Sequence, residues 1–309
     1  MRRLVVCEFA TGVGEFLEWA KAEYRAHPNS YKRIRTSMTS AKEYFKDKPL
    51  STIYEAELEA YKVLRINEHE VCDVTVRHDL HALSVLFQYA MKQNWTRENP
   101  IRNVKIPSDD DAVRIHVITP AEEKEYFARA AGNQNLSDLA RLMRNQGMRP
   151  DEMLSLPKED VDLQRGQMEI KFGKSKASRR TLDLTAGSMR ILARRCQNPS
   201  KWVFPSPVIS GAHILRLNGA HDTACAGSKT RPALYFVLYD WRHTFATRMA
   251  QAKVDLPTLA AILGQGSLRV VQRYVHPIAG HKRLAMLTFE QALAEEWATA
   301  FPGTTETED

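Results

Sequence analysis

Tyr274 is a candidate nucleophile near the end of the chain, in the stretch GQGSLRVVQRYVHP, residues 264–277. Its spacing from Val270 and Val271 predicts a short helix, capped by Ser267, that turns the ring onto an apolar face. A tyrosine at such a spacing is ordinarily a packing residue. Its hydroxyl loses a proton only near pH 10, so a catalytic role needs help from its neighbours. The two interpretations, core aromatic and nucleophile, are both open at this point.

Arg149 lies in a stretch that predicts a tight corner, GMRPDEMLSL, residues 147–156. Gly147 is suited to end one helix and Pro150 to begin the next. The corner would hold the guanidinium beside a helix N-terminus, whose backbone N–H groups favour an anion. The alternative is an ordinary surface ion pair between Arg149 and Glu152.

Arg242 lies in LYDWRHTFATRM, residues 238–249, three positions after Tyr239. On a helix these two side chains share a face. The apolar neighbours place the arginine close to a packed core, where an unpaired charge is costly. Its partner is therefore either a carboxylate of the protein or a phosphate from outside.

Lysines occupy a turn between two alternating segments, QMEIKF and RTLDL, which predict a hairpin. The turn, GKSKASR, carries Lys174 and Lys176, and turn lysines are usually only solvated. They belong to a basic run made up of Lys171, Lys174, Lys176, Arg179, Arg180, Arg190, Arg194 and Arg195. Such a run is suited to a phosphate backbone; the alternative is a solvated face.

The chain as a whole is basic, with a formal net charge of +7 and a pI of about 9.2. Nearly all of the excess lies after residue 116. A content of 43% hydrophobic and 26% charged residues is typical of a globular protein, and no apolar run is long enough to span a membrane. We predict no signal peptide in the first residues, because Glu8 interrupts a short apolar run.

Cysteine usage indicates reduced thiols in a cytoplasmic protein. The four cysteines are far apart, so neither a zinc ribbon nor a disulfide framework is predicted. We expect no metal and no other cofactor.

The elements that position these residues divide into two halves. Residues 8–105 predict a helical domain, whose longest helix carries an apolar stripe and, on its other side, basic residues. The stripe is Leu80, Leu83, Leu86, Phe87 and Ala90, and the other side shows Arg77, His78 and Lys92. Residues 106–116, with Pro107 and three consecutive aspartates, are predicted to be a linker.

A second domain is predicted over residues 117–309. Thr119, Pro120 and Glu122 give the pattern of a helix start with a capping box. Helices are expected to about residue 158, then the hairpin, a loop rich in Gly, Ala and Ser over 206–232, and helices again to about 299.

Taken together and in order, the stretches GMRPDEMLSL, FGKSKASRRTLDL, LYDWRHTFATRM and LAAILGQGSLRVVQRYVHP resemble the tyrosine recombinase (phage integrase) family from about Thr119 to Pro277. The first half resembles the helical core-binding domain of that family more loosely. The resemblance implies a mainly α fold with a small β-hairpin sheet, arranged as a two-domain DNA clamp.

The resemblance also implies roles for individual residues. Arg149 and Arg242 match the two family arginines, Tyr274 matches the nucleophile, and Lys174 matches the hairpin lysine with Lys176 as its rival. Tyr239 stands where histidine is more frequent. Gln265 stands where a histidine would follow Leu-Gly, and its amide cannot shuttle a proton. We therefore expect a slower enzyme.

The chemistry implied is cleavage and rejoining of double-stranded DNA through a 3′-phosphotyrosyl intermediate. The two guanidinium groups would stabilise the phosphoryl oxygens without a metal, and a hairpin lysine would protonate the leaving 5′-oxygen. DNA contacts are expected from Lys176, Arg179, Arg77 and Lys92, and a homo-oligomer, a tetramer, is expected on DNA. The last helix, with Leu287, Phe289, Leu293 and Trp297, is predicted to pack either on a neighbouring protomer or on its own domain.

Two other functions fit the same pattern. One is a DNA-binding protein of this fold that has lost cleavage, an interpretation that Gln265 favours. The other is an enzyme that nicks and recloses DNA, similar to the type IB topoisomerases. A basic helical protein with no DNA role would leave the ordered motifs as coincidence.

Overall fold

The computed structural model describes residues 3–108, 115–173, 176–228, 230–274 and 279–300. The chain separates into two compact units, Met1–Arg114 and Ile115–Asp309, and the boundary falls within residues 106–116. His116 already belongs to the second unit, because its ring stacks on Phe236 with the ring centres 5.9 Å apart. No helix in the described ranges is both long and apolar enough to cross a membrane.

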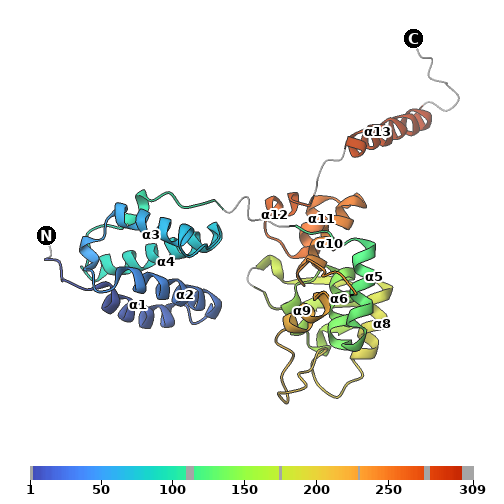
Figure 1. Cartoon of the computed structure of the whole chain (residues 1–309). Coiled ribbons are helices and arrows are strands. Elements are labelled where there is room, and N and C mark those ends of the chain that lie inside the picture. Colours follow the sequence, from blue (N-terminus) through green and yellow to red (C-terminus); the bar gives the residue numbers. More distant parts are fainter. Residues whose placement is uncertain (1–2, 109–114, 174–175, 229, 275–278, 301–309) are drawn as a thin grey trace, which may run out of the picture. The chain divides into compact units, whose positions relative to one another are not determined.

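The first unit is built from four helices (Figure 1). They are α1 (Phe9–Glu23), α2 (Pro28–Phe45), α3 (Glu55–Asn67) and α4 (Asp73–Lys92), with the short 3₁₀ turns η1 (Leu50–Thr52) and η2 (Pro100–Asn103). The apolar stripe predicted on the longest helix is confirmed, since all five of its residues are buried on α4. Aromatic rings from the other helices fill much of the remaining core, among them Phe9, Phe16, Phe45 and Tyr61.

The second unit is mainly helical with one small sheet. Its helices are α5 (Pro120–Arg129), α6 (Gln134–Gln146), α7 (Pro150–Leu154), α8 (Ala186–Arg195), α9 (Asn218–Cys225), α10 (Asp240–Gln251), α11 (Leu256–Leu263), α12 (Leu268–Gln272) and α13 (Ala279–Ala300). The 3₁₀ turns are η4 (Ala130–Gly132), η5 (Lys158–Asp160) and η6 (Lys176–Ser178). The predicted helix start is confirmed, because Thr119 caps α5 and Glu122 completes the capping box.

The sheet is antiparallel and has the order β1 (Val161–Asp162), β2 (Gln167–Ile170), β3 (Arg180–Asp183). The β2–β3 hairpin agrees with the prediction, with Met168 opposite Leu182, whereas β1 was not predicted. Phe172 differs from its predicted place in the alternation. β2 ends at Ile170, so the ring lies beyond the strand and is 78% exposed.

The segment predicted as one loop over 206–232 contains a helix, α9. Its buried face carries His221, Ala224 and Cys225. The imidazole of His221 lies 2.9 Å from the hydroxyl of Tyr126 and 3.0 Å from the carbonyl of Phe236. These contacts with α5 and with the segment before α10 compensate for the low helix propensity of Gly219. Because of that low propensity, the composition of the segment did not indicate a helix.

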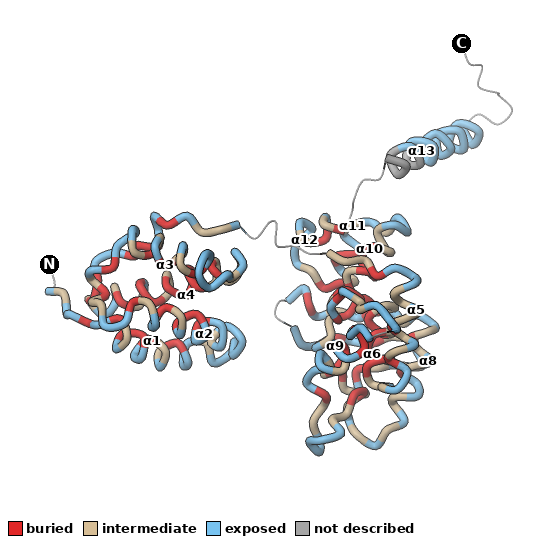
Figure 2. Tube along the Cα trace, viewed as in Figure 1, coloured by how far each residue is buried: buried red, intermediate tan, exposed pale blue. Residues whose placement is uncertain are grey.

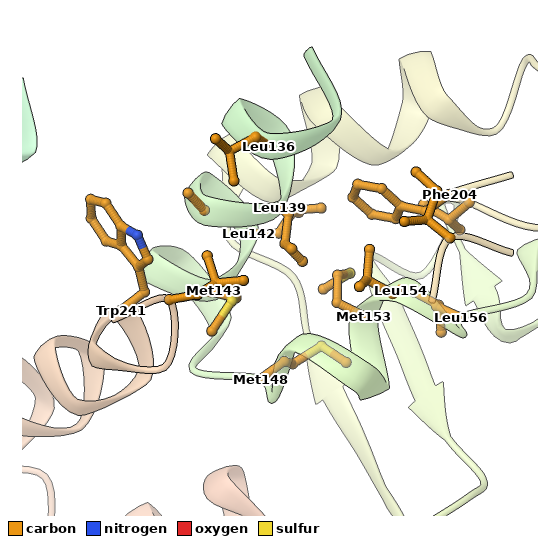
Figure 3. Packing of buried hydrophobic residues seen from close by; sticks show 14 of the residues in the cluster. Leu136, Leu139, Leu142, Met143, Met148, Met153, Leu154, Leu156, Phe204 and Trp241 are labelled. Carbon is orange, nitrogen blue, oxygen red and sulfur yellow. The ribbon is translucent and has the colours of Figure 1, made fainter. Parts of the chain in front are cut away.

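Helix α6 runs through the centre of the second core, because residues on most of its faces are buried. Figure 3 shows Leu139 and Met143 projecting from α6 towards Met148 and Met153, with Trp241 at the start of α10 nearby. Figure 2 shows how the buried positions follow the inner faces of the helices in each unit, while residues 286–300 of α13 are exposed. A smaller cluster made by α10, α11 and α12 includes Phe245, Leu259, Leu263, Val271 and Tyr274. The candidate site forms where this cluster meets the end of α6.

Candidate active site

Arg242, in the first turn of α10, is fully buried and is held by two backbone carbonyls. Nη1 donates to the carbonyl of Gly147 at 2.8 Å, and Nη2 donates to that of Leu263 at 2.6 Å. Its Nε has no hydrogen-bond partner among the described residues. Burial lowers the pKa of the guanidinium, because it disfavours the charged form. Within the described residues no carboxylate forms an ion pair with Arg242. The structure therefore does not support the alternative in which a carboxylate of the protein is its partner.

Two glycines set the geometry around Arg242. Gly147 ends α6 with a φ of 64° and Gly264 ends α11 with a φ of 62°, both in the left-handed region that favours glycine. A Cβ on Gly147 would lie 2.2 Å from the ring of Phe245, and one on Gly264 would lie 2.7 Å from Nη1 of Arg180. The absence of a side chain at these two helix ends leaves room for Phe245 and for the guanidinium of Arg180.

Arg149 stands at the predicted corner, as the residue before the first turn of α7. Its guanidinium donates to Glu152 at 2.6 Å, so the predicted ion pair is also present. The carboxylate of Glu152 also accepts two hydrogen bonds from the guanidinium of Arg180 on β3, at 2.9 and 3.2 Å. Burial raises the pKa of Glu152, but the bonds from Arg180 and Arg149 outweigh it and hold the pKa below its usual range.

The electrostatic balance of this cluster is positive. The guanidinium groups of Arg149, Arg180 and Arg242 are close enough to influence one another. Among the described residues, Glu152 is the carboxylate that pairs with Arg149 and Arg180, and Arg242 has no carboxylate partner. Two positive charges are therefore uncompensated in a place that is mostly buried. An anion with several oxygens would satisfy the unused N–H donors and the excess charge together.

Tyr274 lies beside this cluster and is 4% exposed. It follows α12, which ends at Gln272, so the expectation that the ring belongs to the helix is wrong by two residues, whereas its burial is confirmed. The hydroxyl lies 2.9 Å from Nδ1 of His243 on α10. Burial raises its pKa and so does Tyr239, while Arg242, Arg273 and Arg149 oppose the rise. The structure thus makes Tyr274 both a core residue and a neighbour of the arginines.

Tyr239 and Gln265 complete the surroundings. The ring of Tyr239 has its centre 6.0 Å from the guanidinium carbon of Arg242 and 5.1 Å from the ring centre of His243. Gln265 is half-buried and follows Gly264, and its backbone N–H donates to the carbonyl of Ala260 at 2.9 Å. Both residues are therefore on elements that carry or contact Arg242.

The β2–β3 turn lies against the end of α11. A Cβ on Gly266 would contact Ala177 at 3.6 Å, and one on Gly264 would lie 3.2 Å from the carbonyl of Ala177. Lys176, the neighbour of Ala177, is exposed in η6. Lys174 lies outside the described residues. The turn therefore comes to the same part of the unit as the arginines.

Several members of the predicted basic run have carboxylate partners inside the protein. Lys171 pairs with Asp160, and both Arg194 and Arg195 pair with the buried Asp138. Arg179 is exposed beside Arg180. Of the two basic residues proposed on α4, Lys92 is exposed, and Arg77 is half-buried with Nη1 donating to the carbonyl of Pro107 at 3.1 Å. The run is thus partly a set of structural ion pairs.

Sequence reasoning missed two residues of the site, Arg180 and His243. Arg180 appeared only as a member of the basic run, although it is the first residue of the predicted strand RTLDL and alternation places it on the same face as Leu182. His243 appeared only as a neighbour of Arg242. A helical spacing argument could not find its contact with Tyr274, because Tyr274 lies 31 positions further along the chain and outside α10.

The chain belongs to the phage integrase family, whose model matches residues 116–281, more than half of its length. Among curated relatives, a putative integrase/recombinase of Sinorhizobium fredii is 22% identical over 226 residues, which cover 71% of this chain and 85% of the relative. The tyrosine recombinase XerC of Bacillus licheniformis is 26% identical over 217 residues, covering 65% and 70%. The predicted family is confirmed.

Solved structures confirm the predicted fold. The Tn1549 transposon integrase, in complex with a circular intermediate DNA, superposes with a TM-score of 0.71 at 16% identity, covering 92% of this chain and 99% of that one. A lambda integrase dimer bound to a COC′ core site has a TM-score of 0.67 at 14% identity, covering 87% and 77%. The likeness agrees with the mainly α architecture with a small sheet that was expected and that this chain has.

Proposed function

We propose that this protein is a site-specific DNA recombinase that cuts and rejoins double-stranded DNA through Tyr274. The hydroxyl oxygen attacks the scissile phosphorus, a Tyr274–phosphate bond forms at the 3′ end, and the bond from phosphorus to the 5′-oxygen breaks. A second DNA end then reverses the step, so the energy of the phosphodiester is kept in the covalent intermediate. Family membership supports the reaction class, and the position of Tyr274 beside the arginines supports the nucleophile.

The observation that carries this proposal is the buried positive charge of the arginine cluster. Arg242 is held by carbonyls alone, and Arg149 and Arg180 share Glu152. A phosphoryl group in its transition state gains negative charge on its oxygens, and fixed guanidinium groups stabilise that charge most where water is excluded. Arg149, whose side chain is 29% exposed, lies on the side from which the phosphate would enter.

Because Arg242 and Tyr274 are buried in the free chain, the phosphate reaches them only after neighbouring residues move. We propose that DNA binding supplies the free energy for this movement. Cleavage would then be confined to the DNA-bound protein. The free protein would keep its nucleophile out of contact with water and with unrelated phosphates.

The leaving 5′-oxygen needs a proton, and the hairpin turn offers two lysines for it. Lys176 is adjacent to Ala177, which packs against the segment that carries Gln265. Lys174 is the residue that the family pattern favours. Either ammonium would act as general acid. Gln265 would donate its amide N–H to a phosphoryl oxygen, without the charge or the proton shuttling of an imidazole.

Binding of DNA is proposed to involve both units in a clamp, with phosphate contacts from Lys176 and Arg179 in the second unit and from Arg77 and Lys92 in the first. A tetramer on DNA is proposed as the working assembly; a lambda integrase tetramer bound to a Holliday junction is among the similar structures. The exposed apolar residues of α13 support the neighbouring protomer as the surface on which this helix packs, namely Met286, Leu287, Phe289 and Leu293.

The test is covalent capture of the intermediate. The full-length protein is incubated with a pool of nicked duplexes that have a randomised core, and with duplexes from the DNA that flanks its gene. The nick lets the cleaved fragment diffuse away, so the adduct accumulates. We expect an adduct on Tyr274 by mass spectrometry, absent in Tyr274→Phe with DNA binding kept. An adduct on Tyr239 instead would refute the assignment.

A second candidate function is DNA binding without cleavage. Gln265 and the burial of Tyr274 favour it. This candidate expects tight, salt-sensitive binding to selected DNA and no adduct under any condition. Gln265→His separates the two functions further, because recovery of cleavage in that variant would identify the missing imidazole as the defect. Relaxation of supercoiled plasmid by the single protein would point instead to a nicking and closing enzyme.

A further inference from the structure

His243 makes a contact that the proposed mechanism has not used. Its Nδ1 lies 2.9 Å from the hydroxyl oxygen of Tyr274, and the two ring centres are 5.6 Å apart. His243 is half-buried on α10, directly after Arg242, so the helix that fixes the arginine also fixes the imidazole. The contact joins a possible proton acceptor to the proposed nucleophile.

The surroundings of His243 keep the imidazole neutral near pH 7. Burial lowers its pKa, and the nearby charges of Arg273 and Arg242 lower it further, while Asp240 acts in the opposite direction. The phenol of Tyr274 is protonated under the same conditions, because its pKa is raised. A neutral imidazole beside a protonated phenol allows Nδ1 to accept the hydrogen bond when the ring proton is on Nε2, which is the tautomer that a base at this position requires.

The other residues of the site, among those that the structure describes, offer no group hydrogen-bonded to the phenol of Tyr274 that can accept its proton. Gln265 has an amide that cannot take up a proton, and Tyr239 carries a phenol. The guanidinium groups of Arg149 and Arg242 are already charged and only donate hydrogen bonds. Among the described residues, the imidazole in contact with the nucleophile is that of His243.

We propose that His243 is the general base of this recombinase. As the oxygen of Tyr274 forms its bond to phosphorus, the phenolic proton passes to Nδ1 of His243, and the bond from phosphorus to the 5′-oxygen breaks with a proton supplied by the hairpin lysine. The imidazolium returns its proton to Tyr274 when a 5′-hydroxyl attacks in the rejoining step. This inference rests on the proposed function, since it assigns a role around the same nucleophile.

The fold supplies a matched control for the test. His221 on α9 lies with Nδ1 2.9 Å from the hydroxyl of Tyr126, and it is buried with a pKa that burial lowers. This second pair has the same chemistry as the first but belongs to the core around α5 and α9. Among the described residues, the hydrogen bonds of His221 go to Tyr126, to the carbonyl of Phe236 and to the thiol of Cys225, not to the arginine cluster. His221→Asn therefore reports the general cost of changing a buried imidazole that is bonded to a tyrosine.

The experiment measures single-turnover cleavage of a captured nicked duplex by the full-length protein across pH 5–9. In His243→Asn the side-chain oxygen takes the place of Nδ1, so a hydrogen bond to Tyr274 is kept while basicity is lost. We expect cleavage about 10²- to 10⁴-fold slower, with DNA binding unchanged, since general acid–base catalysis contributes about that much. The His221→Asn control is expected to cleave within a few-fold of the wild type.

Three further readouts separate a base from a residue that only positions the tyrosine. The wild-type rate should fall as the pH drops through the lowered pKa of His243, because imidazolium cannot accept a proton, and this acid limb should be missing in His243→Asn. A 5′-thiolate leaving group should not rescue His243→Asn, because the defect lies in the nucleophile. In His243→Gly, added imidazole should restore part of the rate.

A wild-type rate or a retained acid limb in His243→Asn would overturn the inference while leaving the proposed function intact. Failure of the wild-type protein itself to form an adduct on Tyr274 would overturn the proposed function, and the inference with it. Equal losses in His243→Asn and His221→Asn, with matching losses of thermal stability, would assign His243 to folding alone.

Discussion

Gly147 and Arg242 are joined by a hydrogen bond of 2.8 Å from the guanidinium to the glycine carbonyl, across 95 positions of sequence. The glycine ends α6 with a φ of 64°, and the ring of Phe245 lies where a Cβ would be. The bond therefore depends on a residue without a side chain at position 147.

Gly147→Ala is the first test of this relationship. The substitution combines a left-handed φ with a clash of 2.2 Å against Phe245, so we expect a loss of about 1–3 kcal/mol in the free energy of unfolding and slower cleavage through a displaced Arg242. Gly211→Ala is the matched control, because Gly211 has a φ of 73° with open space around its Cβ. Urea unfolding of both variants measures the difference. Equal losses would show that Phe245 yields and that Arg242 does not depend on the glycine.

Arg242→Lys tests the guanidinium itself. A lysine keeps the charge but cannot bind both carbonyls and a phosphate in the same planar geometry. We expect cleavage to fall by about 10²- to 10³-fold, with DNA binding within a few-fold, because the interaction is strongest with the transition-state charge. Arg248→Lys on the same helix is the control, since Arg248 bonds to Glu123 and to the carbonyl of Ile118. An unchanged cleavage rate in Arg242→Lys would contradict the assignment.

Glu152→Gln tests the carboxylate that two arginines share. A buried ion pair that loses one partner typically costs about 3–5 kcal/mol, so we expect a large loss of stability at pH 7. The folded pKa of Glu152 is lowered, so its stabilisation is present above the ordinary carboxyl pKa and disappears as the pH falls through the folded value. The wild type should therefore lose stability below about pH 4.5, and the variant should lose less.

Glu125→Gln serves as the comparison for that pH series, because Glu125 pairs with Arg129 at an exposed position. Little change in stability is expected from it. If Glu152→Gln lost as little stability as Glu125→Gln, the carboxylate of Glu152 would not be needed to keep Arg149 and Arg180 in place.

The two hairpin lysines are distinguished by the leaving group. The lysine that protonates the 5′-oxygen should give slow cleavage when changed to alanine, and a 5′-thiolate should rescue that variant because sulfur leaves without a proton. The comparison is Lys174→Ala with Lys176→Ala in single-turnover cleavage. Rescue of Lys174→Ala follows the family pattern, whereas rescue of Lys176→Ala alone would transfer the role to Lys176. If the 5′-thiolate rescued neither variant, neither lysine of the turn would be the general acid.

Basic residues with and without internal partners should differ in their effect on DNA binding. Arg179 is exposed, whereas Arg194 bonds to both carboxylate oxygens of Asp138 at 2.6 Å. A phosphate contact contributes about one unit to the slope of log affinity against log salt concentration, so Arg179→Ala should reduce that slope and Arg194→Ala should not. Titrations at several salt concentrations measure it. Equal slopes in both variants would place the DNA elsewhere.

The local structure around Arg149 was predictable because it depends on nearby residues. Gly147 and Pro150 carry their own conformational preferences, and both the end of α6 and the start of α7 lie where the pattern indicates. The hairpin pair Met168 and Leu182 followed from alternation in the same way. Residues that are close in sequence, with strong preferences, determine these features.

The contacts that assemble the site depend on distant residues, and no pattern in the sequence records them. Arg180 reaches Glu152 from another element, and His243 reaches Tyr274 across 31 positions. Helix α9 was missed for a similar reason, since its stability comes from packing on Tyr126 rather than from its composition. Local propensity predicted the helices and strands that carry these side chains, and tertiary packing determined which residues the side chains contact.

The way in which Arg242 is held has a consequence for the tolerance of the site to acid. Its two acceptors are carbonyls at the C-terminal ends of α6 and α11, where aligned peptide dipoles concentrate about half a negative charge. Peptide dipoles do not titrate, so this arginine keeps its anchor at any pH at which the helices are folded. The guanidinium of Arg149 instead depends on the carboxylate of Glu152, whereas Arg180 also donates to the carbonyls of Ile262 and Ser178. Because the pKa of Glu152 is lowered, only acid below the ordinary carboxyl range would protonate it, and that change would release Arg149 while Arg242 stays in place.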